Sequence, residues 1–401
     1  MKWIDSTDLR NWANRRDCQE NLPLLVRKLI RATSNTIQSI HFPSGDNVLI
    51  GGWDGILKVL EETEYLPQGT SLWEFGSNKD PKGKADDDYE KRTKSPLGFD
   101  TCESNFIFVT PRLWQKGNDW ANEKKKEGFW KDVRVINAET LEEWIEIAPT
   151  VGAWLAKYIG KYPNEGIQPT DDFWEEWVTG NKFKLNSEIL LGGRQKAQEN
   201  IINLINNPSV SAVQGISREE SLAFILSCFK SNPHIEEDFF SRSIIVDNAD
   251  AFRELCMHDK PLILIPRFED NGVVNRAVSK GHTVIIPLGA DSTDNWSNKI
   301  VLPHIERDAF VAALTKTGMT KEFAEKYSKE SARNITVLRR QLEFTRTFPE
   351  WALPQNVSDI IPALLVGRWN DDAKYDREII SKLARDSYEN YIKKLVQNRI
   401  C

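Results

Sequence analysis

The sequence predicts an α/β protein with two sheets, and three observations support this prediction. Strand patterns alternate with helical patterns from the N-terminus to about residue 305, as is typical of α/β folds. The strands of the second half are short and strongly apolar, as in a parallel sheet that helices cover on both faces. The chain has 401 residues, more than one hydrophobic core usually organises. We therefore expect a mixed sheet flanked by helices, followed by a parallel α/β domain with a helical lid.

The composition is that of a folded protein, with 40% hydrophobic and 28% charged residues. No apolar run approaches the roughly 20 residues needed to cross a bilayer, and the N-terminus has no apolar signal segment, so we expect a cytoplasmic protein without a membrane partner. The five cysteines are scattered and form no CxxC pair, which argues against a zinc site or a disulfide framework. The net charge of −6 argues against a protein that coats nucleic acid through its overall field.

Residues 1–160 are predicted to form the first domain. Apolar residues at helical spacing alternate with strand patterns in a definite order. The elements are a helix at 21–32, strands at 36–42, 51–60 and 70–76, a helix at 86–93, a strand at 105–110, a helix at 120–127, a strand at 131–136 and a helix from 138.

Residues 161–190, rich in Gly and Pro, are predicted to be a linker with one short helix. A second alternating pattern occupies 191–305, and its strands are expected at 211–215, 243–248, 261–268 and 282–289. The remainder, 306–401, is predicted to be helical.

Asp54 and Glu74 are the candidate catalytic carboxylates. Asp54 stands at the head of one predicted strand and Glu74 lies about 20 residues on in the next, so an antiparallel pair of strands would bring them together. Glu74 has apolar neighbours, and an acid in such a strand is costly to bury unless it is paired or bound to a metal. Carboxylates that hold Mg²⁺ are what phosphodiester hydrolysis requires. The alternative is that each acid caps a strand or pairs with a lysine.

The first domain resembles the PD-(D/E)XK nucleases, and the similarity spans roughly residues 1–160. The residues that carry it are Gly52-Trp53-Asp54-Gly55, Trp73-Glu74, Lys84-Ala85, Asp88-Tyr89, Lys91-Arg92, Phe108 to Arg112 and Trp130 to Trp144. The resemblance implies a restriction-endonuclease-like fold, Mg²⁺ or Mn²⁺ as cofactor and DNA as substrate. It also implies that Asp54 and Glu74 bind the metal, with Glu20 as a further acid.

One position departs from this family. The lysine usually found two residues after the glutamate is replaced by Gly76. Lys79 or Lys84 could supply the ammonium from the following loop or helix, because a lysine has a long and flexible stem. Lys79 is preferred over Lys84, and if neither reaches the site the domain is an inactive DNA-binding relic.

Three residues that follow the candidate catalytic residues in the sequence are candidates for binding nucleic acid. Tyr89, Lys91 and Arg92 fall on one predicted helix and could face a phosphate backbone. The alternative is a salt-bridged protein surface. The tryptophans of the first domain are expected in the core rather than as base-stacking platforms, and they are Trp53, Trp73, Trp130 and Trp144.

The second domain resembles a STAND or AAA-type ATPase module in the order of its elements. Where GxxxxGK[ST] would follow the first strand, the chain runs from Gly215 to Ser221 with Glu219 and Glu220 in place of Gly and Lys. Two carboxylates would repel a triphosphate, so ATP hydrolysis is not expected. Glu269 and Asp270 follow the strand that normally ends in Mg²⁺-binding acids.

Nucleases fused to such modules resemble bacterial antiviral defence proteins. The resemblance implies a DNA endonuclease effector in antiphage defence, controlled by a degenerate ATPase-like domain, forming a homo-oligomer and answering a phage-derived or nucleotide trigger. The start of a winged-helix-like element near the C-terminus leads us to expect a larger sensor region beyond it. The competing hypothesis is a non-catalytic nucleic-acid-binding or sensor scaffold. A nucleotide-driven switch is a third, against which Glu219 and Glu220 argue.

Overall fold

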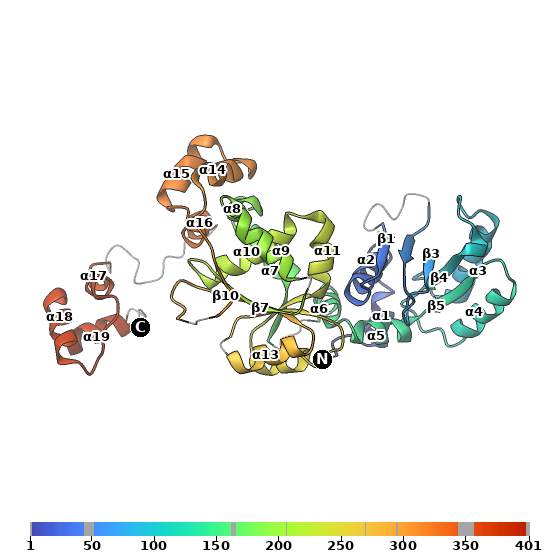
Figure 1. The fold of residues 1–401 in the computed structure, drawn as a ribbon, viewed down its shortest axis with the longest axis horizontal. Coiled ribbons are helices and arrows are strands. Elements are labelled where there is room, and N and C mark those ends of the chain that lie inside the picture. The colour runs from blue at the N-terminus through green and yellow to red at the C-terminus, as the bar shows by residue number, and fades with distance from the viewer. Residues whose placement is uncertain are drawn as a thin grey trace. The chain divides into compact units, whose positions relative to one another are not determined.

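The chain has an α/β fold with two mixed sheets, one of five and one of six strands (Figure 1). The computed structural model describes residues 2–43, 52–161, 166–205, 207–268, 270–293, 296–343 and 357–397. The backbone divides into two compact units, Met1–Leu338 and Arg339–Cys401. Both sheets lie in the first unit. Among the described helices, none is long and apolar enough to cross a membrane.

The first sheet has the strand order β1-β2-β3-β4-β5. Its first three strands are antiparallel, whereas β3, β4 and β5 run parallel. The strands are β1 (Ile37–His41), β2 (Gly55–Val59), β3 (Gly69–Phe75), β4 (Ser104–Val109) and β5 (Asp132–Ile136). Each lies within two residues of its expected bounds except β2, which begins at Gly55, because residues 52–54 are described but precede the strand.

Helices cover both faces of this sheet (Figure 1). Successive residues of β3 point to opposite faces of the sheet. Trp73 packs in the core beneath α2, and Leu72 packs in the core beneath α3 and α4. Glu74 has the parity of Leu72. The helices are α1 (Ser6–Trp12), α2 (Arg16–Thr33), α5 (Ala138–Glu146) and α6 (Pro149–Tyr158) on the Trp73 side, and α3 (Pro81–Lys94) and α4 (Gly117–Lys126) on the Leu72 side.

The second sheet has the order β11-β7-β10-β9-β8-β6. Its strands are β6 (Ile167–Pro169), β7 (Val210–Gln214), β8 (Ser243–Val246), β9 (Ile263–Pro266), β10 (Thr283–Leu288) and β11 (Lys299–Val301). The expected parallel strands are present, but β6 pairs antiparallel with β8. The sheet is therefore mixed rather than wholly parallel, and part of the expected linker is its edge strand.

The second sheet is also a middle layer between helices (Figure 1). α10 contacts β7 and β10 on one face, and α12 and α13 pack with the apolar residues of the other. The helices around this sheet are α7 (Thr170–Thr179), α8 (Glu188–Leu191), α9 (Gln195–Leu204), α10 (Arg218–Lys230), α11 (Pro233–Arg242), α12 (Ala249–Leu255) and α13 (Asn271–Ser279).

The C-terminal part is helical, as expected, but it belongs to two units. α14 (Arg307–Lys316) and α15 (Lys321–Glu330) pack together within the first unit, and α14 also packs against α8. α16 (Ile335–Leu342) crosses the boundary between the units. The second unit contains α17 (Val357–Val366), α18 (Lys374–Ala384) and α19 (Tyr388–Gln397), which share a small core around Ile380, Tyr391 and Leu395.

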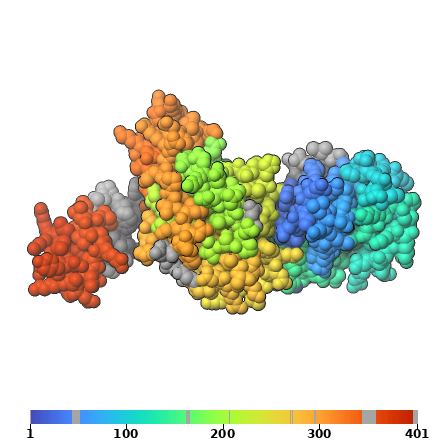
Figure 2. All heavy atoms as spheres, in the orientation of Figure 1, coloured from blue at the N-terminus to red at the C-terminus, as the bar shows by residue number. Residues whose placement is uncertain are grey.

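The helical layers of the two sheets contact each other where α2, from the first, packs against α11, from the second (Figure 2, blue against yellow-green). α6 and α7 lie beside this contact. α6 contributes to both cores, because Leu155 packs with the first and Ala153 with the second. A cavity of about 390 Å³ lies between these helices. The first predicted boundary, at residue 160, thus follows a helix that both sheets use for packing.

Candidate active site

Asp54 and Glu74 lie opposite each other at the ends of neighbouring strands. Gly55 pairs with Trp73 in the antiparallel β2–β3 ladder. Continuing this register by one residue places Asp54, directly before β2, opposite Glu74 of β3. The carboxylate of Asp54 accepts a hydrogen bond from the backbone amide of Phe75 at 3.0 Å. The expected meeting of the two acids therefore takes place.

Glu74 is buried, with 3% of its surface exposed. Its carboxylate pairs with the guanidinium of Arg92, which also donates to the carbonyl of Gly52 and lies 4.6 Å from the ring of Trp53. Burial, followed by the charge of Asp54, raises the pKa of Glu74 to about 8, and Arg92 opposes this shift. Glu74 is thus a buried acid with a raised pKa whose partner is the guanidinium of Arg92.

Arg92 does not have the role that the sequence suggested. It is 4% exposed, so it cannot face a nucleic-acid backbone. Tyr89 is 2% exposed, packs between Phe106 and Trp120 and donates to the carbonyl of Lys124 at 3.2 Å. Both residues are core residues of α3.

Lys91 is exposed on α3, as expected for a residue that binds nucleic acid. The expected burial of the tryptophans is confirmed, and they are Trp53, Trp73, Trp130 and Trp144.

Lys84 lies beside the position that departs from the family pattern. A Cβ added to Gly76 would come within 2.8 Å of both Cγ of Lys84 and Cζ of Phe108, so the lysine stem and the Phe108 ring together fill the space of a side chain at position 76. Its ammonium is 2.7 Å from Oδ1 of Asp88, one helical turn further along α3. The stem of Lys84 therefore lies beside Gly76, whereas Lys79, the lysine preferred from the sequence, is exposed in the segment before α3.

Asp88 is a third acid in this region. It is 4% exposed, and its Oδ2 has no hydrogen-bond partner in the structure. Burial raises the pKa of Asp88, while Lys84 lowers it and Asp54 adds to the rise. Asp88 also raises the pKa of Glu74, so the three acids act on one another. The sequence reasoning assigned no role to Asp88, although its spacing of four residues from Lys84 was a usable signal.

Glu20 does not join this group. Its carboxylate is 3.6 Å from Arg16 on α2, and its charge acts on Tyr158. Because α2 covers the Trp73 side of the sheet and Glu74 has the opposite parity, Glu20 lies with a different set of side chains. The structure therefore gives no support for Glu20 as a metal ligand.

The donors near Glu74 suit a hard divalent cation in kind, since such ions take carboxylate oxygens. The orphaned Oδ2 of Asp88 is an acceptor that a cation or its ligands could satisfy. As they stand, however, no three acidic, histidine or cysteine side chains of the described ranges are arranged to hold a metal. Glu74 would have to exchange Arg92 for the ion.

The position of a phosphate loop in the second sheet is taken by an internal carboxylate. Glu220 is 1% exposed, pairs with the buried Arg194 at 2.6 Å and accepts from the amide of Ile216 at 3.1 Å. Ser221 accepts from the amide of Gly215 at 2.7 Å. The loop amides that would bind a phosphate are thus satisfied by side chains of the helix that follows.

A cavity of about 750 Å³ opens beside this loop, between the ends of β7 and β10. Ser217, Arg218 and Asp291 are among the residues that line it. Of the two acids that lie beyond the strand which in ATPases ends in Mg²⁺-binding acids, Glu269 lies outside the described residues, and Asp270 caps α13 by accepting from the amide of Gly272 at 3.0 Å. Asp270 is therefore the N-cap of α13.

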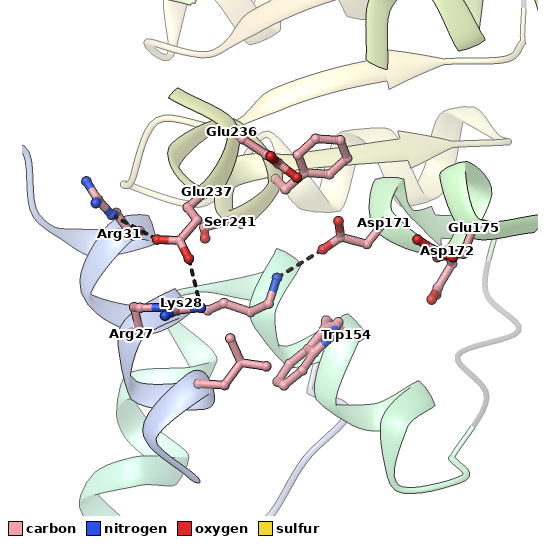
Figure 3. A pocket seen from close by; sticks show the side chains of 12 residues that line it. Arg27, Lys28, Arg31, Trp154, Asp171, Asp172, Glu175, Glu236, Glu237 and Ser241 are labelled. Carbon is pink, nitrogen blue, oxygen red and sulfur yellow. Dashed lines mark hydrogen bonds and ion pairs between the residues drawn. The ribbon is translucent and has the colours of Figure 1, made fainter. Parts of the chain in front are cut away.

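Opposite charges join the two halves of the first unit, and we call this set the α2–α11 junction. Arg27 and Arg31 of α2 lie 2.8 and 3.7 Å from Glu237 of α11, and Lys28 lies 2.9 Å from Asp171 of α7 (Figure 3). Lys28 and Lys230 lower the pKa of Asp171, although burial raises it. The sequence reasoning did not single out these residues.

No protein-family model and no curated protein matches this chain.

Proposed function

We propose that the chain is a Mg²⁺- or Mn²⁺-dependent DNA endonuclease whose active site lies between β2, β3 and α3. The observation that carries the proposal is the meeting of Asp54 and Glu74 at adjacent strand ends, with the stem of Lys84 in the space beside Gly76. Two acids and a lysine are the groups that metal-assisted phosphodiester hydrolysis needs.

The residues have distinct roles in this proposal. Asp54 and Glu74 hold the ion, which supplies Lewis acidity when bound. The backbone amide of Phe75 orients Asp54 by a hydrogen bond of 3.0 Å. Lys84 places a positive charge where the scissile phosphate gains negative charge. Lys91 and other exposed lysines contact the DNA backbone, which makes binding dependent on salt.

We further propose that the second sheet regulates this site without hydrolysing ATP. Glu220 satisfies the loop amide and the buried Arg194, so a triphosphate would have to displace a paired carboxylate. The α2–α11 junction is the route by which this region would act on the first sheet. A homo-oligomeric effector of antiphage defence, answering a phage-derived or nucleotide trigger in the cytoplasm, is the setting we propose.

A non-catalytic nucleic-acid-binding scaffold is the second candidate. The observation in its favour is the pairing of Glu74 with Arg92, which neutralises the acid without a metal. In this case neither Mg²⁺ nor the acids would affect the fate of bound DNA.

Cleavage assays separate the two candidates. Supercoiled plasmid and single-stranded RNA are incubated with the full chain and Mg²⁺ or Mn²⁺, alongside Asp54→Asn, Glu74→Gln and the control Glu90→Gln on the exposed face of α3. We expect plasmid cleavage by the wild type and the control, and loss of about 100-fold or more in the two site variants. Equal cleavage in all four proteins would reject the assigned site, and DNA binding without cleavage would favour the scaffold.

Regulation has its own test. Glu237→Lys places a third positive charge against Arg27 and Arg31 and should weaken the α2–α11 junction. If the second sheet restrains the nuclease, cleavage increases in this variant and returns towards the wild-type rate when Arg27→Glu is added. The control is Glu188→Lys, which breaks an exposed pair with Lys316 far from α2 in the chain. Phage plaque counts for cells expressing Asp54→Asn test the proposed setting.

A further inference from the structure

We propose that Asp88 is a positioning residue for the nuclease reaction, which holds the ammonium of Lys84, whose stem passes Gly76. The inference rests on the proposed function and adds to it a residue that the motif of two acids and a lysine does not contain.

The first observation is the route of the lysine. Lys84 belongs to α3, but its Cγ would lie 2.8 Å from a Cβ at Gly76, directly after the end of β3. A lysine at position 76 would be fixed by its own strand, whereas Lys84 reaches the same space from a neighbouring helix. A stem with four rotatable bonds needs a second anchor to keep its charge in one place.

The second observation is that Asp88 supplies this anchor from a buried position. Its Oδ1 is 2.7 Å from the ammonium of Lys84, and its side chain is 5% exposed while that of Lys84 is 31% exposed. The pair therefore joins the ammonium of the partly exposed lysine to a carboxylate that is held in the interior. Asp54 also acts on Asp88 electrostatically, so the anchor belongs to the same group of charges as the proposed metal ligands.

The third observation is that this pair is unlike its neighbour on the same helix. Lys82 and Asp86 have the same spacing and a similar distance of 2.8 Å, but their side chains are 64% and 38% exposed. An exposed pair of this kind contributes little to stability. The Oδ2 of Asp88, in contrast, is buried without a partner, which costs free energy that surface pairing does not explain. The Lys82–Asp86 pair is therefore a matched control.

The chemistry of the step is electrostatic. Lys84 forms and breaks no bond in it, and Asp88 neither gives nor takes a proton. Asp88 keeps the ammonium directed at the position where the phosphate gains charge, which lowers the reorganisation needed in the transition state. Removing Asp88 should thus lower kcat more than it raises KM.

The experiment measures plasmid cleavage by Asp88→Asn, Asp88→Glu, Lys84→Met and the double variant Lys84→Met/Asp88→Asn. Asp86→Asn is the control, and the thermal midpoint of each full-length variant is recorded. We expect Asp88→Asn to lower kcat for plasmid cleavage about 10- to 100-fold with KM changed by less than about threefold. Asp88→Glu should recover part of the rate, and the double variant should be no slower than Lys84→Met. Asp86→Asn should stay within about twofold of the wild type.

A second readout does not need activity. Acetylation of each lysine by a limiting amount of acetic anhydride is followed by mass spectrometry, and the rate at Lys84 should rise about tenfold in Asp88→Asn, because the amine loses a charged hydrogen bond. The rate at Lys82 in Asp86→Asn should change far less.

The outcomes distinguish the inference from the proposed function. If Asp54→Asn and Glu74→Gln abolish cleavage while Asp88→Asn leaves kcat intact, the inference is wrong and the function stands. If cleavage survives loss of Asp54 and Glu74, the function falls and the role of Asp88 falls with it. Unchanged labelling of Lys84 in Asp88→Asn also overturns the inference, whatever the activity.

Discussion

Replacing Glu74 by glutamine should make the stability of the first sheet less sensitive to pH. Glu74 is 3% exposed, and burial with the charge of Asp54 raises its pKa from 4.5 to about 8. Between these two values the folded chain holds a proton that the unfolded chain releases, so the free energy of unfolding falls as pH rises. Glutamine has nearly the same shape and does not titrate.

The size of the effect follows from the shift. One pKa unit corresponds to about 1.4 kcal/mol, so the full shift at Glu74 corresponds to at most about 5 kcal/mol. From about pH 5.5 to about pH 8 the wild type should lose roughly 3 kcal/mol through this group. The stability of Glu74→Gln relative to the wild type should therefore rise by the same amount over this interval.

The measurement is urea unfolding of the full chain at both pH values. Hydrogen exchange of the peptide that contains β3 is the probe of unfolding, so that the free energy measured is that of the first sheet. The control is Glu90→Gln, because Glu90 and its partner Lys94 are both 74% exposed and should show no such change. An equal stability difference at both pH values would refute the reasoning. It would mean that the Arg92 pair outweighs burial and keeps Glu74 ionised throughout.

Three further predictions concern other buried groups. Arg194→Met leaves the carboxylate of Glu220 buried without its cation and should cost about 3–5 kcal/mol, seen as a lower thermal midpoint; an unchanged midpoint would contradict this. His282 accepts from a backbone amide at 3.1 Å, and burial lowers its pKa, so stability should fall as pH drops below about 6.5, and this fall should be smaller in His282→Gln. Gly76→Ala should destabilise by about 1–3 kcal/mol and slow plasmid cleavage, because the added methyl displaces Lys84.

The long elements of both sheets could be predicted because their patterns are local. The strand expected at 105–110 is β4, and the strand expected at 282–289 contains β10. Both are fully buried, and a continuous apolar run between turn residues needs no tertiary information to be found. The edge strands β6 and β11 were missed, since each has only three residues and exists through its pairing with β8 or β7.

The face of α3 shows why the site itself was only partly predictable. Its buried residues are Ala85, Asp88, Tyr89 and Arg92, at the spacing of an amphipathic helix. Two of the four are charged, so hydrophobic patterning assigns them to the surface. Each is buried beside an opposite charge: Glu74 of the neighbouring strand β3 pairs with Arg92, and Lys84, one turn earlier on α3, pairs with Asp88.

The sequence by itself determined the α/β class, the order of most elements and the meeting of Asp54 with Glu74, because periodicity and strand succession are properties of the chain. The tertiary structure decided which charges are buried and which partners they have. It placed Lys84 in the space at Gly76, gave Arg92 to Glu74 and put Glu220 where a phosphate would bind. Such choices depend on how strands, loops and helices pack against one another, because a buried charge is tolerated only where the fold brings its counter-charge within reach.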